Sequence, residues 1–223
     1  MNIGILTYDK PHKRTQDIVA SLSLLKFKNI TIIRNKYREY KNKKINTLHH
    51  HRPYQFVGLT AEEISKKYNY ELKEIEDLNC YENLEYVLIC GSNLLEKKYI
   101  KKKFIINSHS GLIPETRGLD SIKWAIYNNK PAGNTLHFID EKIDQGEIIS
   151  QIETPVYASD DLQTFFERHY QMELEMLINF RSNLLNKNNF LLTSTKPTMR
   201  MSFEKEKDLI NKFEIYKKTF AKK

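Results

Sequence analysis

The sequence predicts an α/β protein with a Rossmann-like, mostly parallel sheet flanked by helices and a short helical extension at the C-terminal end. Residues 3–7 form an apolar run that is followed by an amphipathic segment and then by the β-branched run 30–33, the order of a right-handed βαβ unit. Residues 86–90 and 104–106 are uninterrupted apolar runs, typical of strands that are covered on both faces. Polar residues follow both runs, at the sheet edge where α/β proteins bind ligands.

Capping residues and apolar periodicity predict the helices of the N-terminal half. Thr15 is expected to cap a first helix. Apolar residues recur on one face of that helix, namely Ile18, Val19, Leu22 and Leu25. Thr60 and Glu63 have the spacing of a capping box and open a second helix that runs through Tyr68.

The C-terminal half predicts a hairpin between two helices. Gly118 and Asp120 introduce the first of these helices. Residues 135–139 alternate like a strand, and residues 147–154 are expected to be its hairpin partner after a tight turn at 144–146. Asp160 or Asp161 then caps a long helix, and we interpret the aromatic residues on its apolar face as core.

The chain is predicted to consist of a catalytic domain, residues 1–186, and a C-terminal part, residues 187–223, with a linker and an amphipathic helix. Four apolar residues recur at helical spacing in that part: Leu209, Phe213, Tyr216 and Phe220. The helix can pack on its own domain or on a second subunit, so the sequence leaves a homodimer open.

Composition favours a cytoplasmic protein with an anionic ligand. The N-terminus lacks the pattern of a signal peptide, and no run reaches membrane-spanning length. Cys80 and Cys90 lie in or beside apolar sequence and are expected to be buried thiols. The net charge of +8 suggests a nucleotide, a phosphate or a nucleic acid as partner. For residues 36–58, which include His49–His51, a mobile basic loop is favoured over a metal site, because the segment supplies no further ligands at suitable spacing.

Asn107, His109 and Asp144 are the candidate catalytic residues. Asn107 and His109 are two positions apart at a strand end, so in extended geometry their side chains share one face. A carboxamide and a protonated imidazole can each donate a hydrogen bond to the oxyanion that forms when an amine attacks a formyl carbon. An aspartate can keep the imidazole charged and relay protons through water. The alternatives are that Asn107 and His109 satisfy backbone groups and that Asp144 serves the turn beside Gly146.

Five sequence blocks resemble the folate-dependent formyltransferases, and most closely the sugar-nucleotide N-formyltransferases. These blocks are residues 107–114, 117–118, 124–126, 133–137 and 143–149, and a weaker match extends to the helix near Phe180. The resemblance implies the formyltransferase fold and 10-formyltetrahydrofolate as formyl donor, with no metal. It gives Asn107 and His109 the polarisation of the formyl group and gives Asp144 the ordering of water and the proton transfer.

The resemblance also implies residues for the folate pocket. Asn93, Leu94 and Leu95 match the loop whose backbone holds the pteridine ring, while Ile139 and Asp140 match the second wall of that pocket. Thr135 stands where a hydroxyl residue commonly helps to hold water, or it is there for strand propensity. Ser110–Gly111 replaces the family's usual proline and serine, and we expect this variant to loosen the turn without removing its donors.

The acceptor that the resemblance favours is the amine of a nucleotide-linked amino sugar, preferably dTDP-linked, in surface polysaccharide (lipopolysaccharide) synthesis. After the first strand, residues 7–14 lack the glycine-rich phosphate loop of the glycinamide ribonucleotide enzymes. Methionyl-tRNA formyltransferases would have a further C-terminal domain. Lys10, His12, Lys13 and Arg14, with His50 or Arg52, are candidates for facing the diphosphate.

Three alternatives stay open: a formyltransferase acting on glycinamide ribonucleotide or methionyl-tRNA, a non-catalytic nucleotide- or folate-binding module, and an RNA-binding protein. We expect neither a nucleic-acid nor a membrane partner, because the candidate residues point to formyl transfer.

Overall fold

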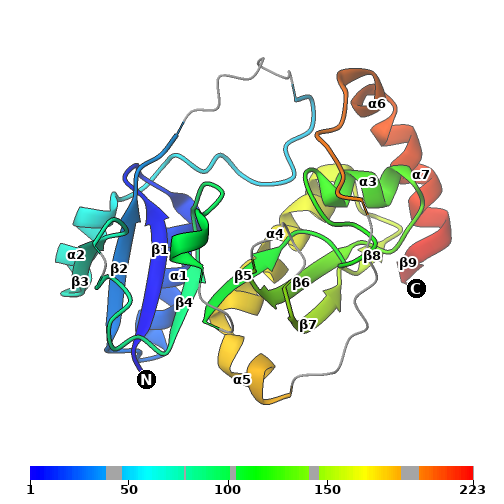
Figure 1. The fold of residues 1–223 in the computed structure, drawn as a ribbon. Helices are drawn as coiled ribbons and strands as arrows, with labels where there is room; N and C mark the ends of the chain where they lie inside the picture. Colours follow the sequence, from blue (N-terminus) through cyan, green and yellow to red (C-terminus); the bar gives the residue numbers. More distant parts are fainter. Residues whose placement is uncertain (39–46, 78, 101–103, 141–145, 187–195, 223) are drawn as a thin grey trace. The chain divides into compact units, whose positions relative to one another are not determined.

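The computed structural model describes residues 1–38, 47–77, 79–100, 104–140, 146–186 and 196–222 (Figure 1). Contacts divide the chain into two units. Unit 1 comprises residues 1–40, 54–107 and 138–141, and unit 2 comprises residues 41–53, 108–137 and 142–223.

A seven-stranded, mostly parallel sheet confirms the predicted fold class. Its strands are β1 (Ile3–Tyr8), β2 (Ile30–Asn35), β3 (Glu71–Glu74), β4 (Tyr86–Ile89), β5 (Ile105–His109), β6 (Gly133–Phe138) and β7 (Ile148–Glu153). The order is β3-β2-β1-β4-β5-β6-β7. The pairings of β1 with β2 and β4, of β2 with β3 and of β4 with β5 are parallel, while β6 and β7 form the predicted antiparallel hairpin.

The helices largely follow the predicted order. They are α1 (Lys13–Leu24), α2 (Ala61–Tyr68), the 3-10 helix η1 (Lys97–Tyr99), α3 (Ser121–Tyr127), α4 (Leu162–Ile178), α5 (Phe180–Leu185), α6 (Phe203–Lys207) and α7 (Leu209–Phe220). A short parallel pair, β8 (Val156–Tyr157) and β9 (Ala221–Lys222), completes the described elements. None of the described helices is long and apolar enough to cross a bilayer.

In unit 1, α1 packs its apolar face on the sheet, and its start differs from the prediction. Ile18, Val19 and Leu22 are fully buried, as expected. Thr15, however, lies within the helix, and its hydroxyl contacts the Thr7 hydroxyl at 2.6 Å instead of capping backbone. The N-cap residue is His12, whose side chain makes no capping hydrogen bond. The predicted capping box of Thr60 and Glu63 at the start of α2 is confirmed.

In unit 2, the C-terminal helix is part of the core. Leu209, Phe213 and Tyr216 of α7 are buried in one cluster with Phe165 and Phe166 of α4. Asp161 caps α4 by accepting a hydrogen bond from the Thr164 backbone, as one of the two predicted capping residues. The structure thus packs this helix against its own chain. The division into a domain of residues 1–186 and a separate C-terminal part stays a prediction.

The described part of the basic segment 36–58 is a loop, as expected, and ion pairs attach part of it to unit 2. Arg52 forms a two-point ion pair with Glu173 of α4, a fully buried carboxylate, with Nε 2.9 Å from Oε2. The Leu48 backbone donates to Glu206, which is also paired with the buried ammonium group of Lys123. Carboxylates distant in the sequence therefore hold residues 48–52 in unit 2. Residues 39–46 lie outside the described residues.

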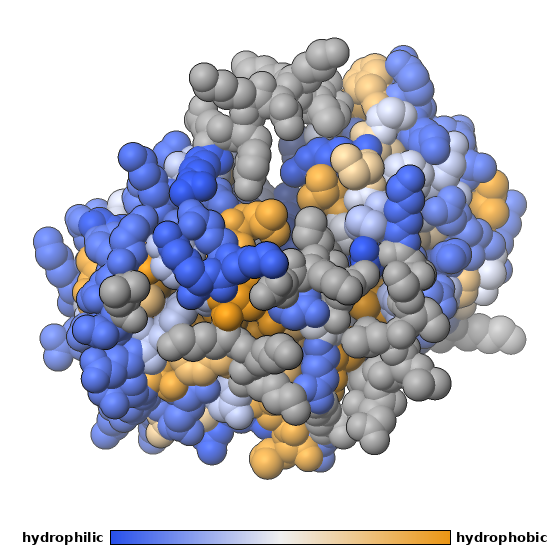
Figure 2. Space-filling view, in the orientation of Figure 1, coloured by the Kyte–Doolittle hydropathy of each residue, from blue (hydrophilic) through white to orange (hydrophobic). Residues whose placement is uncertain are grey.

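The visible face of the molecule is predominantly hydrophilic (Figure 2).

Cys80 and Cys90 are both free and buried, as predicted. Burial raises the pKa of the Cys90 thiol to about 12, because the thiolate would lose its hydration. Cys90 is therefore a protonated packing residue at neutral pH.

Candidate functional site

Strand β5 carries both Asn107 and His109. The strand continues through His109, whereas the sequence indicated that the apolar run ends at Ile106 and polar residues follow. Residues two apart on a strand point to the same side, so Asn107 and His109 share one face, as predicted. Asn107 is half-buried and His109 is buried. This places an amide and an imidazole next to each other at the end of a strand.

Hydrogen bonds fix the orientation of the His109 ring. Its Nε2 lies 2.9 Å from the carbonyl oxygen of Thr116 and 3.2 Å from the Ser121 hydroxyl. A carbonyl oxygen only accepts, so Nε2 carries a hydrogen. The Ser121 hydroxyl donates to Gly118 and therefore offers Nε2 an acceptor. It follows that Nδ1 holds a lone pair in the neutral ring and becomes a donor when the ring is protonated.

The loop after β5 is closely packed, while the expectation that Ser110–Gly111 loosens the turn relative to the family's proline and serine stays a prediction. A Cβ added at Gly111 would lie 2.0 Å from the Thr116 carbonyl oxygen and 2.8 Å from His109 Nε2. Only glycine allows the carbonyl and the imidazole to approach each other in this way. The Leu112 backbone donates to the Thr116 hydroxyl at 2.8 Å and closes the loop.

Thr135 of β6 supports the same loop. Its hydroxyl donates to the Gly111 carbonyl at 2.6 Å and accepts from the Ile113 backbone at 3.0 Å. Gln151 of β7 donates to the Ile113 carbonyl at 2.6 Å. The β6–β7 hairpin therefore fixes the backbone of the loop. The structure gives Thr135 this supporting contact; the role in holding water stays a prediction.

His169 is a buried support that the sequence analysis missed. Its Nε2 lies 2.9 Å from the Ser110 hydroxyl, and its Nδ1 lies 2.7 Å from the Thr154 hydroxyl. The side chain is fully buried, and loss of hydration lowers its pKa to about 3, so the ring is neutral. The available signal was a lone histidine on the apolar face of α4. His169 thus anchors the residue next to His109.

Asp144 lies outside the described residues. Its position beside Asn107 and His109 therefore stays a prediction, as does the turn at residues 144–146 that was expected to present it.

Two of the five candidate folate residues pack against one cluster in unit 1. Leu95 and Ile139 are both partly buried against the cluster that contains Val87 and Ile105. The Ile139 backbone donates to the Ile105 carbonyl at 2.9 Å, which attaches this residue to β5. Partly covered apolar side chains of this kind suit a flat ring such as a pteridine.

Of the other three candidate folate residues, only Leu94 is exposed. Asn93 donates from its side chain to the Lys36 carbonyl at 2.8 Å, and this bond ties the β4 loop to the end of β2. Leu94 is 72% exposed, and Asp140 is half-buried. Asn93 therefore stabilises the loop, and the contact of the loop backbone with the ring stays a prediction.

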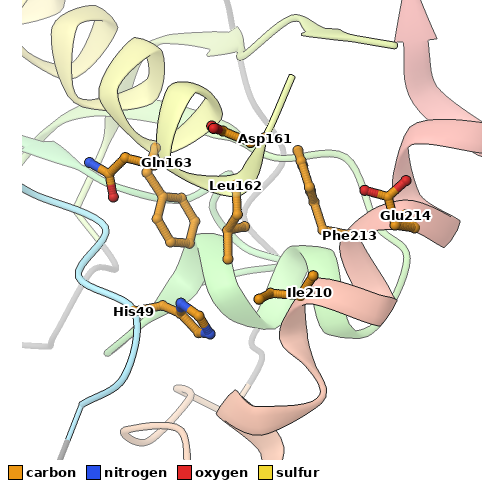
Figure 3. A pocket seen from close by; sticks show the side chains of 8 residues that line it. His49, Asp161, Leu162, Gln163, Ile210, Phe213 and Glu214 are labelled. Atoms are coloured by element: carbon orange, nitrogen blue, oxygen red, sulfur yellow. The ribbon is translucent and has the colours of Figure 1, made fainter. Parts of the chain in front are cut away.

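A separate pocket of about 290 Å³ lies in unit 2 (Figure 3). Leu162, Phe166 and Phe213 give it apolar walls, while Asp161 and Glu214 carry carboxylates at its side. None of the candidate catalytic or folate residues that the structure describes lines this pocket. It is therefore separate from the described part of the predicted active site. Within the described residues, no group of three histidine, cysteine or carboxylate side chains has the arrangement of a metal site.

Parts of this chain are similar to known proteins. The methionyl-tRNA formyltransferase of Lactococcus lactis subsp. cremoris is 37% identical over 79 residues, which are 35% of this chain and 24% of that protein. The phosphoribosylglycinamide formyltransferase of Bacillus subtilis is 33% identical over 105 residues, which are 47% of this chain and 52% of that protein. The chain thus spans a quarter to a half of the length of these two relatives.

Solved structures share the fold. An N-formyltransferase from Helicobacter canadensis has a TM-score of 0.61 at 17% identity, over 96% of this chain and 81% of that chain. The phosphoribosylglycinamide formyltransferase of Bacillus halodurans has a TM-score of 0.60 at 20% identity, over 84% of this chain and 96% of that chain. Residues 19–180, most of the chain, match the family described as formyl transferase. The protein therefore belongs to the formyl transferase family.

Proposed function

We propose that the protein transfers a formyl group from 10-formyltetrahydrofolate to the primary amine of a nucleotide-linked amino sugar, with a dTDP-linked sugar favoured, in surface polysaccharide synthesis. The observation that carries this proposal is the pairing of Asn107 with an oriented His109 on β5, in a member of the formyl transferase family. A homodimer and a cytoplasmic location stay predictions.

The described residues fit a folate donor. Leu95 and Ile139 offer apolar contacts in unit 1 that suit a flat ring. The Helicobacter canadensis structure is described as a complex with folinic acid and dTDP-3-aminofucose. We extend this folate binding to Asn93, Leu94, Leu95, Ile139 and Asp140 as candidate residues.

The chain's own residues account for the chemistry of acyl transfer. 10-Formyltetrahydrofolate supplies the formyl group. The attacking amine forms a new bond to the formyl carbon, and negative charge then builds on the formyl oxygen. The Asn107 amide and the protonated Nδ1 of His109 would donate to that oxygen, because the Nε2 hydrogen of His109 is directed at the Thr116 carbonyl. Asp144 would accept the amine proton through water and return a proton to the folate nitrogen as its bond to the formyl carbon breaks, which gives the formamide and tetrahydrofolate.

The loop between β1 and α1 favours a nucleotide-linked sugar as the acceptor over glycinamide ribonucleotide. Residues 9–12 contain no glycine, so the loop lacks the close backbone approach by which glycine-rich loops hold a terminal phosphate. Two related structures are described with nucleotide-linked sugars, dTDP-3-aminofucose in one and UDP-4,6-dideoxy-4-formamido-L-AltNAc in the other. These observations support a nucleotide sugar over glycinamide ribonucleotide.

The test is to incubate the protein with 10-formyltetrahydrofolate and a panel of dTDP- and UDP-linked amino sugars, with glycinamide ribonucleotide and methionyl-tRNA as competing acceptors. We expect one sugar to gain the mass of one formyl group. His109→Asn and Asp144→Asn should each lower turnover by about 100-fold or more. Asp77→Asn, an exposed aspartate in unit 1, is the matched control and should leave turnover unchanged. Formylation of only glycinamide ribonucleotide or methionyl-tRNA would refute the sugar acceptor, and normal turnover of either variant would refute its assigned role.

A further inference from the structure

We propose that an aromatic cluster at the carboxyl edge of unit 1 binds the nucleobase of the acceptor; this inference rests on the proposed function. The aromatic cluster consists of Tyr8, Tyr37, Tyr54 and Phe56. The ring centroids of Tyr37 and Phe56 are 4.9 Å apart, those of Tyr8 and Tyr37 are 5.1 Å apart, and those of Tyr54 and Phe56 are 6.1 Å apart. The sequence analysis did not single out these residues.

The cluster is open to solvent, unlike the aromatic residues of the core. Tyr54 is 70% exposed, and the other three rings are half-buried. Stacking of a planar base on an exposed aromatic ring is favourable by about 1–3 kcal/mol, and it tolerates any of the bases. Four such rings gathered at one place therefore offer a stacking surface for a flat ligand.

The position of the cluster matches the ligand edge of a parallel sheet. Strand β1 is followed along the chain by β2 and β3 on one side, whereas β4 lies on its other side. The strand order thus reverses between β1 and β4, and open α/β sheets bind ligands at such a point. A Cβ added at Gly91, just after β4, would lie 2.8 Å from Cδ2 of Tyr8. Tyr8 therefore lies directly at the reversal.

Backbone bonds hold the cluster in place. The Lys13 backbone at the start of α1 donates to the Gln55 carbonyl at 2.7 Å, between Tyr54 and Phe56. The Tyr37 backbone donates to the Asp9 carboxylate at 2.8 Å. Three separate segments are thus fastened together around the rings. Such an arrangement reduces the ordering that a ligand would have to impose.

One lysine gives the cluster an anion-binding group. The ammonium nitrogen of Lys10 lies 4.4 Å from the centroid of the Tyr37 ring, and the side chain is exposed. No ion pair joins Lys10 to a carboxylate within the described residues. His12 and Arg14 are buried, Lys13 is paired with Asp17 at 2.9 Å, and Arg52 is paired with Glu173. Of the predicted diphosphate candidates in unit 1, Lys10 is therefore the one that the structure favours.

The distance between the aromatic cluster and Asn107 suits a ligand as long as a nucleoside diphosphate sugar. The cluster follows the ends of β1 and β2, while Asn107 lies on β5, three strand positions from β2. Strands are spaced by about 4.8 Å, so the span is about 14 Å. A nucleoside diphosphate sugar has its base at one end and its amine at the other, with the phosphates between. Glycinamide ribonucleotide has no nucleobase and would leave the aromatic cluster unused.

The test measures binding of dTDP and UDP by calorimetry, with inorganic pyrophosphate as the probe that lacks a ring. We expect Tyr54→Ala and Phe56→Leu each to weaken dTDP binding by about tenfold, while pyrophosphate binding is unchanged. Tyr54→Phe keeps the ring and should bind dTDP within about twofold of the unmodified protein. Lys10→Gln should weaken both probes. Tyr68→Ala, which removes one ring of the stacked Tyr68–Tyr70 pair elsewhere in unit 1, is the matched control and should change neither.

The outcomes separate this inference from the proposed function. Thermal unfolding checks that each variant is folded, and the exposure of Tyr54 makes its replacement the safer of the two. If the unmodified protein formylates a nucleotide sugar and both ring variants keep its dTDP affinity and KM, the aromatic cluster is not the base site, although the proposed function stands. Tighter binding of a six-residue oligothymidylate than of dTDP would also overturn the inference, in favour of a nucleic-acid site.

Discussion

His169 makes the stability of unit 2 depend on pH. Its pKa is about 3 in the folded chain, against an ordinary value of 6.5, because burial removes the hydration of the charged ring. Below pH 6.5 the unfolded chain therefore binds a proton that the folded chain excludes, and the free energy of unfolding decreases as the pH falls. The decrease is about 1.4 kcal/mol per pH unit once the unfolded residue is protonated, so about 3 kcal/mol is lost between pH 6.5 and pH 4.

The replacement His169→Gln tests this reasoning. Glutamine can keep polar contact with Ser110 and Thr154 but does not titrate. Urea unfolding, followed by circular dichroism at pH 7, 6, 5 and 4, gives the free energy of unfolding of both proteins. We expect the advantage of the unmodified protein to shrink by about 1.4 kcal/mol per unit below pH 6.

A matched control isolates the buried position. His50 is exposed, so His50→Gln should leave the pH dependence parallel to that of the unmodified protein. Other groups also respond to acid, among them His51, whose pKa burial lowers well below its usual value. The difference between the two curves removes these shared contributions. Parallel curves for His169→Gln and the unmodified protein would refute the claim that His169 is neutral and excluded from protonation.

Two further replacements test the contacts around the site. Gly111→Ala should lower turnover by about 100-fold and the free energy of unfolding by about 2 kcal/mol, because the added Cβ must displace the Thr116 carbonyl and His109; kinetics and urea unfolding measure both, and an unchanged turnover would show that the close approach is dispensable. Arg52→Met should lower the free energy of unfolding by about 3 kcal/mol, because it takes the guanidinium from the buried Glu173 carboxylate. The double replacement Arg52→Met with Glu173→Leu should recover part of this loss, and a loss below about 1 kcal/mol for Arg52→Met alone would contradict the argument.

Local signals in the sequence predicted most of the fold. These signals lie in residues that are close together in the sequence. They are the apolar runs of β1, β2, β4 and β5 and the capping box of α2, and the structure confirms them. Strand β3 was missed because its four residues, Glu71–Glu74, are mostly polar and contain no apolar run. It pairs with one neighbour only, at the edge of the sheet, and backbone pairing rather than side-chain burial defines it.

The contacts that a local pattern cannot contain were predicted poorly. Threonine is a residue type that often caps helices, but the Thr15 hydroxyl is hydrogen-bonded to the Thr7 hydroxyl on β1. Residues 48–52 look like a solvated basic loop, because their carboxylate partners, Glu173 and Glu206, lie more than a hundred positions away. Asn107 and His109 were found from their spacing on one strand, whereas the His169 support required two segments to meet.

Unit 2 takes a short piece of chain from the N-terminal quarter, residues 41–53, and the rest from residue 108 onward. During synthesis, Arg52 therefore leaves the ribosome long before Glu173 does. Closing so long a loop is entropically unfavourable, and a carboxylate without its cation resists burial. The Arg52–Glu173 pair thus joins a segment that is synthesised early to a helix that is synthesised late. We expect α4 to pack in its final position only after residues 48–52 bind to it.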